Sequence, residues 1–469
     1  MSSHRGGVKE LAPQRQETQV AAAGDQSGNV PGELDSSRVK DSTGFVARIL
    51  AATKDVTWSA DGAPTDFLMR LEVGNRIRLA TGLLKIEFSG GAEIILHAPA
   101  DLQVLGPDAA RLFSGNLTGR SDAGSFNLFT PAAKVIDVGT EFGVSVDADR
   151  NTGVSVFDGE VHVRPMQQEE SPDSLFRLTR GMSARVDRRG FIQSGLDVDS
   201  SRLRRLLPHE ASTTLGASEV SLIDIISGSG VGERRLAGSI DPATGYWGQP
   251  PWQQTKGVEP RVSHGQLVSV DWNPLLDGVF VPPAEAGPIQ IDSSGRSITL
   301  GPTCGATWGS IWARRRLDHS FDPLAGVRDE NEQGFWGVGT IAALMERLQW
   351  SRDGLVGIHP NVGVTVDLDE VRLQRGRSVR RMRGVIAHLE KSHESSPLYP
   401  GVRADFRIYV DGTLRFERLG FRRSDGDSQF GVNFEDGDRF LTLVTTDSDA
   451  SNAFDHVILI DPILELADP

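Results

Sequence analysis

The chain contains a single cysteine, Cys304, among its 469 residues. One thiol cannot form an intrachain disulfide, and it cannot build a zinc site from several thiolates. No His or Lys adjoins Cys304 to activate the thiol, so we interpret it as a structural residue and not as a nucleophile.

Long hydrophobic runs are also missing. The apolar stretch from Phe45 to Ala52 is interrupted by Arg48 and is far shorter than the roughly 20 residues that a membrane-spanning helix needs. No secretory signal pattern is visible either. The sequence therefore predicts no membrane span in this chain.

An excess of positive charge is absent. The formal net charge is −14 and the pI is near 5.3, which argues against a general affinity for nucleic acid or anionic lipid. One dense basic run lies between Arg372 and Arg383, but it has no interleaved aromatic residues. We expect it to be a solvated loop, with no nucleic-acid partner.

Known catalytic and cofactor motifs are missing as well. The chain has no phosphate-binding loop, no Gly-x-Gly-x-x-Gly after a strand, no Gly-x-Ser-x-Gly and no His-Glu-x-x-His. We expect no catalytic residue, no metal site and no cofactor. A carbohydrate-active enzyme, or its accessory binding subunit, stays an alternative because carboxylates are plentiful and could pair after folding.

Glycine and proline are abundant, at 52 and 24 residues, which favours short strands and turns over long helices. The predicted fold class is mostly β, with four parts along the chain. They are a disordered tail (1–40), a β-domain (46–192), a linker (193–220) and a second β-domain (221–469).

The segment from Thr130 to Val163 has the strongest strand pattern. Phe142, Val144 and Val146 recur at a spacing of two, which is the period of a half-buried strand. Polar turn residues follow, and Asp158-Gly159 is a hairpin signal. We expect three short strands in a β-meander, with the glycines setting turns and register.

This segment resembles the end of a FecR-type domain, through Thr130-Pro131, the run Val138-Gly139-Thr140-Glu141-Phe142, and Asp158-Gly159-Glu160-Val161. The resemblance extends over about Val46 to Ile192. It implies the extracytoplasmic, periplasmic sensing part of a regulator that acts on a sigma factor. Members of that family usually carry a membrane-spanning helix before the domain, and such a run is not visible here.

The C-terminal part alternates in the same way. Ala404–Val410 is a predicted strand that ends in the hairpin signal Asp411-Gly412. Phe440–Asp447 and Val457–Ile460 are further predicted strands. Short strands with Gly, Asp and Pro between them predict a β-sandwich or jelly roll.

These strands, together with Asp455-His456, resemble the core of NPCBM-type modules, over about Leu355 to Leu466. The resemblance implies a carbohydrate-binding β-sandwich with a polysaccharide ligand. Aromatic rings can stack on the apolar face of a sugar. The candidate ligand-binding residues are Trp247, Trp252, Trp336, Asp455 and His456.

Each candidate has a structural interpretation as well. Large aromatic residues usually anchor cores, and an Asp-His pair can set the register of a strand. Adjacent residues of a strand point to opposite faces, so Asp455 and His456 could meet one ligand only if the strand is broken there. We expect a non-catalytic regulatory or sensor protein with a glycan-binding module; a passive cell-surface scaffold is the second alternative.

Overall fold

The structure is a computed structural model of the chain, and it describes residues 44–468 with gaps. The predicted tail and most of the predicted linker lie outside the described residues. Antiparallel strands dominate the rest, so the predicted mostly-β fold class is confirmed. The gaps are 54, 60–61, 64–65, 67, 122–124, 168–174, 196–202, 206–217, 229–234, 248–259, 317–337, 390–401, 449–451 and 453–454.

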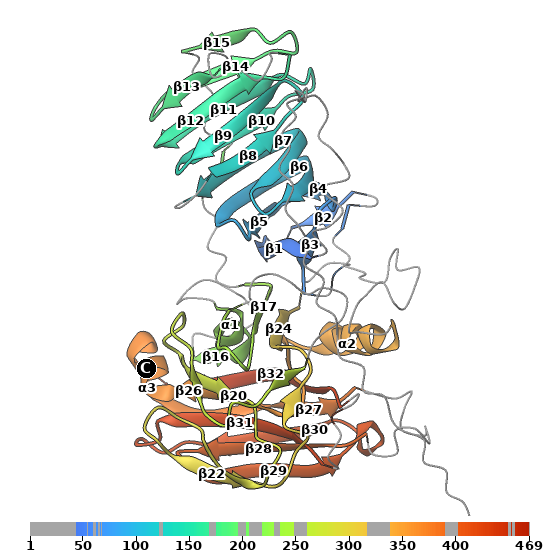
Figure 1. Cartoon of the computed structure of the whole chain (residues 1–469), viewed down its shortest axis with the longest axis vertical. Coiled ribbons are helices and arrows are strands. Elements are labelled where there is room, and N and C mark those ends of the chain that lie inside the picture. The colour runs from blue at the N-terminus through green and yellow to red at the C-terminus, as the bar shows by residue number, and fades with distance from the viewer. Residues whose placement is uncertain are drawn as a thin grey trace, which may run out of the picture. The chain divides into compact units, whose positions relative to one another are not determined.

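The N-terminal β-region (residues 44–195) is one 15-stranded sheet whose strands stack as successive rungs (Figure 1). Its strands are β1 (Phe45–Ala52), β2 (Thr57–Trp58), β3 (Arg70–Glu72), β4 (Arg76–Thr81), β5 (Leu83–Phe88), β6 (Ala92–Gly106), β7 (Ala109–Ser121), β8 (Ser125–Phe129), β9 (Ala133–Val138), β10 (Glu141–Val146), β11 (Thr152–Asp158), β12 (Glu160–Pro165), β13 (Phe176–Thr179), β14 (Ser183–Val186) and β15 (Ile192–Ser194).

This sheet divides at β7. The start of β7 pairs with β8 in parallel, while its second half pairs with β10 in antiparallel fashion. From there β8, β9, β12 and β13 continue on one side and β10, β11, β14 and β15 on the other. Buried residues of both branches, such as Val135 and Val144, belong to one hydrophobic core.

The predicted meander from Thr130 to Val163 is wrong in its pairing, although its strands form. β9 pairs with β8 and β12, and β11 pairs with β10 and β14. The glycines Gly139 and Gly159, both at positive φ, therefore form corners where the chain changes branch. A Cβ on Gly159 would lie 2.5 Å from Thr140 Cγ2. Only the β10–β11 turn is the predicted hairpin.

The described part of the C-terminal β-region (residues 218–468) holds three α-helices and the remaining strands. They are β16 (Glu219–Ser221), α1 (Leu222–Ser227), β17 (Ala237–Ile240), β18 (Arg261–Val262), β19 (Val268–Ser269), β20 (Leu276–Phe280), β21 (Gly287–Gln290), β22 (Ser297–Leu300), β23 (Ala306–Thr307), β24 (Ile311–Arg315), α2 (Val338–Trp350), β25 (Gly354–Ile358), β26 (Val362–Asp367), α3 (Leu368–Arg375), β27 (Val379–His388), β28 (Ala404–Val410), β29 (Thr413–Phe421), β30 (Ser428–Asn433), β31 (Phe440–Asp447) and β32 (Val457–Leu466), with a 3₁₀ turn, η3 (Arg423–Asp425).

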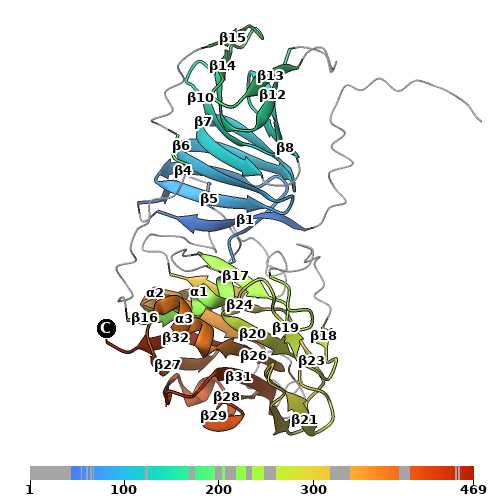
Figure 2. The ribbon, with the colours of Figure 1, turned by 90° about the vertical axis from the view of Figure 1, so that its left-hand side faces the viewer.

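Two antiparallel sheets face one another in this region (Figure 2). Sheet 1 has the order β17-β24-β25-β32-β27-β30, with β16 also on β32, and sheet 2 has the order β19-β20-β26-β31-β28-β29. Buried residues of both sheets, such as Val356 and Leu443, share one core. The hairpin β21–β22 packs Ile289 and Ile298 against Val444 of sheet 2. The predicted β-sandwich is therefore present, and Asp411-Gly412 is its predicted hairpin turn.

Two other predictions can be compared with the structure. Among the described residues, no helix is long and apolar enough to cross a membrane. The basic run from Arg372 to Arg383 was expected in a loop, and this expectation is wrong. The run occupies the end of α3 and the first half of β27, because Gly376 ends the helix and the chain enters sheet 1 three residues later.

Candidate functional site

One end of the sandwich brings three histidines together. His359 follows β25, His388 ends β27 and His456 precedes β32. The pairing register fixes this convergence, because Ile358 and His388 both lie opposite Val457. We call this group, with Asp455, the histidine cluster. Histidine spacing along the chain gave no sign of it.

The predicted pair Asp455 and His456 belongs to the histidine cluster. The His456 ring lies 5.1 Å from that of His359, and Asp455 Oδ1 lies 3.6 Å from His388 Nε2. The two residues precede β32, yet they contact different partners. The side chains of Asp455 and His388 are fully buried, so the pair has no surface that could receive a ligand directly.

Burial controls the charge of these histidines. It lowers the pKa of His359 and of His388 to about 4, and the neighbouring cations and histidines add to the effect at His388. Burial also lowers the pKa of His456 well below its usual value. All three rings are therefore neutral at pH 7, since a charged imidazole loses its hydration in this core.

A polar link joins the same end of sheet 2 to a neighbouring loop. Asn361 Oδ1 accepts the Asp447 backbone N–H at 2.8 Å, and Asn361 Nδ2 donates to Asp447 Oδ2 at 3.1 Å. Asp447 Oδ2 also accepts the Cys304 backbone N–H at 2.9 Å. Burial raises the pKa of the Cys304 thiol to about 11, which agrees with a structural thiol. The described residues hold no group of His, Cys, Asp or Glu that could bind a metal.

The predicted tryptophans have different outcomes. Trp252 and Trp336 lie outside the described residues. Trp247 is half-buried; its Nε1 donates to the Ser227 carbonyl at 3.1 Å, and its ring packs 6.1 Å from that of Trp272. The Arg235 guanidinium lies 4.5 Å from the centre of the Trp247 ring. These contacts give Trp247 an anchoring function and occupy part of its stacking surface.

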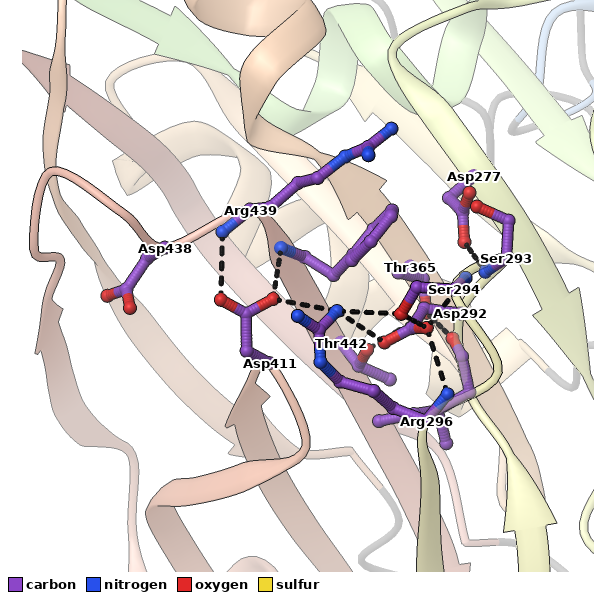
Figure 3. Close-up of polar contacts among 12 residues, drawn as sticks. Asp277, Asp292, Ser293, Ser294, Arg296, Thr365, Asp411, Asp438, Arg439 and Thr442 are labelled. Carbon is purple, nitrogen blue, oxygen red and sulfur yellow. Dashed lines mark hydrogen bonds and ion pairs between the residues drawn. The ribbon is translucent and has the colours of Figure 1, made fainter.

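The opposite end of sheet 2 carries a group of charged residues, some buried and some partly exposed, which we call the polar rim: Asp277, Asp292, Arg296, Asp367, Asp411 and Arg439. The strand ends place them together, because Asp367 lies opposite Phe440 and Val410 lies opposite Leu441. Asp411 occupies the β28–β29 turn at φ 47°. Its carboxylate accepts the backbone N–H groups of Arg439 and Phe440 (Figure 3).

Arg296 is held in place by the loop that contains it. Its Nη1 donates to Ser294 Oγ at 2.8 Å and lies 3.2 Å from Asp411 Oδ1 and 3.4 Å from Asp292 Oδ2 (Figure 3). Asp292 is buried and also accepts the backbone N–H groups of Ser294 and Arg296. The side chain of Arg296 is 39% exposed, and all these contacts use one nitrogen. Its other N–H groups therefore keep donor capacity.

Arg439 is oriented from the other side of the polar rim. Its Nε and Nη2 donate to Asp367 Oδ2 at 3.3 and 2.9 Å, while its side chain is 48% exposed. Asp367 also caps α3 by accepting the N–H groups of Asp369 and Glu370. Burial, together with Asp292 and Asp367, raises the pKa of Asp277. The rim thus offers fixed donors beside carboxylate acceptors at the surface.

Sequence patterns missed the polar rim almost completely. Only Asp411 stood in a predicted feature, where its role was a turn. Asp292 and Arg296 come from the β21–β22 loop and Asp367 comes from the end of β26; the two segments meet through strand pairing and through the packing of β21–β22 on sheet 2. A common signal does exist, since Asp292, Asp367 and Asp411 each accept backbone N–H groups at a strand end.

No family model matches the chain, and no curated protein matches it. Solved structures do show likenesses. One is a family 51 carbohydrate-binding module from a family 95 glycoside hydrolase of Clostridium perfringens, in complex with methyl-galactose. It is 17% identical, covers 24% of this chain and 70% of the module, and has a TM-score of 0.20.

Two further likenesses have similar scores. Tandem family 51 modules of a family 98 glycoside hydrolase from Streptococcus pneumoniae are 8% identical over 71% of this chain and 86% of theirs, with a TM-score of 0.24. A candidate anti-sigma factor of Parabacteroides distasonis is 20% identical over 27% of this chain and 61% of its own length, with a TM-score of 0.22. At sequence identities this low, the ligand of a neighbour cannot be assigned to this chain. Any ligand must be inferred from this chain's own residues.

Proposed function

We propose that the C-terminal β-region binds a glycan at the polar rim and does not turn it over. The observation that carries this proposal is the pair Arg296 and Arg439, both exposed and both held by carboxylates. A sugar presents adjacent hydroxyls that donate and accept hydrogen bonds. Planar guanidinium and carboxylate groups in fixed positions suit such a ligand, because little side-chain freedom is lost on binding.

The histidine cluster then has a supporting function. Its members are buried, and its three histidines are neutral at pH 7, so they hold the ends of β25, β27 and β32 together and do not contact the ligand. The NPCBM-type resemblance of Leu355–Leu466 supports the same ligand class. This resemblance covers Asp367, Asp411 and Arg439 of the polar rim, whereas Asp292 and Arg296 come from the preceding segment.

The test is a glycan array with the full-length protein, followed by calorimetric titration of the best ligand. Arg296→Gln and Arg439→Gln each remove a charge-assisted donor, which is worth about 1.5–3 kcal/mol, so each variant should bind at least tenfold more weakly. Arg180→Gln is the matched control, because Arg180 is 79% exposed in the N-terminal β-region. A flat array, or unchanged affinity in both rim variants, would contradict the proposal.

For the N-terminal β-region we propose regulation of a sigma factor. The support is the FecR-type pattern, whose residues Gly139, Thr140 and Gly159 form adjoining corners of the fold. Asp137 at the same corner accepts a hydrogen bond from the Thr140 hydroxyl. Co-purification of the full-length protein with sigma factors of the extracytoplasmic-function class tests this role. Failure to retain any of them, under conditions where a FecR-type protein does, would exclude it.

A further inference from the structure

A second charged surface lies on sheet 1, at the junction of α3 and β27. It contains Arg375, Arg377, Arg380 and Arg381, which we call the arginine surface. Helix α3 ends at Arg375, and Gly376 takes a left-handed conformation at φ 63° that turns the chain toward β27. The four arginines therefore lie within seven consecutive residues of a defined helix-to-strand turn.

A β-bulge at the start of β27 exposes two of them. Val379 lies opposite Leu466 and Arg381 lies opposite Glu465, so Arg380 is an extra residue relative to β32. A bulge changes the direction of neighbouring side chains. Arg380 and Arg381 are consecutive, yet both are exposed, while Val379 and Met382 on either side are buried.

The described arginines between Arg372 and Arg383 fall into two groups, those with an ion-pair partner and those without one. Arg372 pairs with Asp369 at 2.6 Å, and Arg383 pairs with Glu219 at 2.7 Å. Among the residues that the structure describes, Arg375, Arg380 and Arg381 have no carboxylate within ion-pair distance. A chain with net charge −14 thus gathers unneutralised guanidinium groups at one place.

The neighbouring strand leaves room for one of these groups. A Cβ on Gly431 of β30 would lie 2.4 Å from Arg381 Nη2 and 3.0 Å from its Nε. The guanidinium of Arg381 therefore lies across the backbone of β30, where any side chain would displace it. A planar guanidinium that packs on the backbone of a strand has less freedom to lose when it binds a bidentate anion.

We propose that the arginine surface binds an anionic polysaccharide, such as a chain of uronic acids. Individual exposed ion pairs contribute only about 0–1 kcal/mol, so useful affinity requires a ligand that presents several anions at intervals. A polysaccharide with one carboxylate per sugar does this. The described part of this surface has no exposed aromatic ring for base stacking, which disfavours single-stranded nucleic acid. The choice of a polysaccharide rests on the glycan-binding function proposed above.

The test uses the full-length protein with polygalacturonate, neutral galactan and a single-stranded oligodeoxynucleotide of matched charge. Triple substitution of Arg375, Arg380 and Arg381 by Gln should weaken polygalacturonate binding at least tenfold and reduce its salt dependence. Arg422→Gln is the control, because Arg422 is 43% exposed on another part of the same region. The corresponding Lys variants keep the charge, and they should recover only part of the affinity because the planar fork is lost.

The outcomes separate this inference from the polar-rim proposal. The triple variant should keep the neutral-glycan binding of the parent protein, because it leaves the polar rim intact. Binding of polygalacturonate with a flat neutral-glycan array would support the arginine surface and remove the rim proposal. Equal loss in the Arg422 control, unchanged binding in the triple variant, or oligonucleotide binding as tight as that of polygalacturonate would overturn the inference.

Discussion

Acid should destabilise the C-terminal β-region through its buried histidines. In the folded protein the pKa of His359 and of His388 is about 4, against about 6.5 for an exposed histidine. Below pH 6.5 the unfolded chain therefore binds more protons than the folded one. The stabilising contribution is complete above pH 6.5 and is lost as the pH falls toward 4.

The size of the effect follows from these values. For one histidine with pKa 6.5 unfolded and about 4 folded, the free energy of unfolding falls by about 2 kcal/mol between pH 7.5 and pH 5. His359 and His388 together would lose about 4 kcal/mol if they titrated independently. The charge of His359 acts on His388 and lowers its pKa, so the loss is not strictly additive.

Tryptophan fluorescence is a suitable probe, because every tryptophan except Trp58 follows residue 221. Urea unfolding at several pH values between 5 and 7.5 gives the slope of stability against pH, and hence the difference in bound protons. The His388→Gln variant should lose roughly one histidine's share of this slope. His264→Gln is the control, because His264 is exposed in the same region.

A pH-independent unfolding free energy across this window would refute the reasoning. So would a His388→Gln variant with the same slope as the parent protein. In either case Asp455, which lies 3.6 Å from His388, would have kept the imidazolium stable in the fold. The lowered pKa of His388 would then be incorrect, and its ring would gain a proton below pH 6.5 in the folded protein as it does in the unfolded chain.

Three other perturbations test separate parts of the fold. Burial raises the pKa of Asp137 to about 6, so the N-terminal β-region of the parent protein should lose stability as the pH rises from about 4 through 6. The Asp137→Asn variant should not show this loss, and hydrogen exchange of that region, corrected for intrinsic rates, would measure the difference. Gly357→Ala should cost about 1–3 kcal/mol in a thermal melt, because its Cβ would lie 1.9 Å from Trp312. Trp247→Phe removes the bond to the Ser227 carbonyl and should cost about 1 kcal/mol without weakening glycan binding.

Local patterns predicted those parts of the fold that depend on neighbouring residues. The predicted strand Phe440–Asp447 is β31, and Asp411-Gly412 forms the expected turn with both residues at positive φ. Asp158-Gly159 carries the same kind of signal, yet it forms a corner between branches. A glycine at positive φ indicates that the chain turns tightly, but the choice of partner strand depends on distant residues.

The candidate sites also combine residues that a local pattern can identify with residues that only the fold brings together. Asp455 and His456 could be recognised as a pair, whereas their partners His388 and His359 come from other strand ends. Arg296 and Arg439 approach Asp411 from segments more than a hundred residues apart in sequence. No local pattern encodes these contacts, because strand order and register set them.

The two ends of the sandwich differ for a physical reason that bears on function. At the histidine end, the side chains of His388 and Asp455 are fully buried, so their polar atoms cannot reach a ligand at the surface. At the polar rim, Asp292 and Asp367 take up the buried bonds, so that Arg296 and Arg439 keep exposed donors in fixed positions. Binding capacity depends on this division between buried acceptors and exposed donors, and for that reason we place the glycan at the rim and not at Asp455-His456.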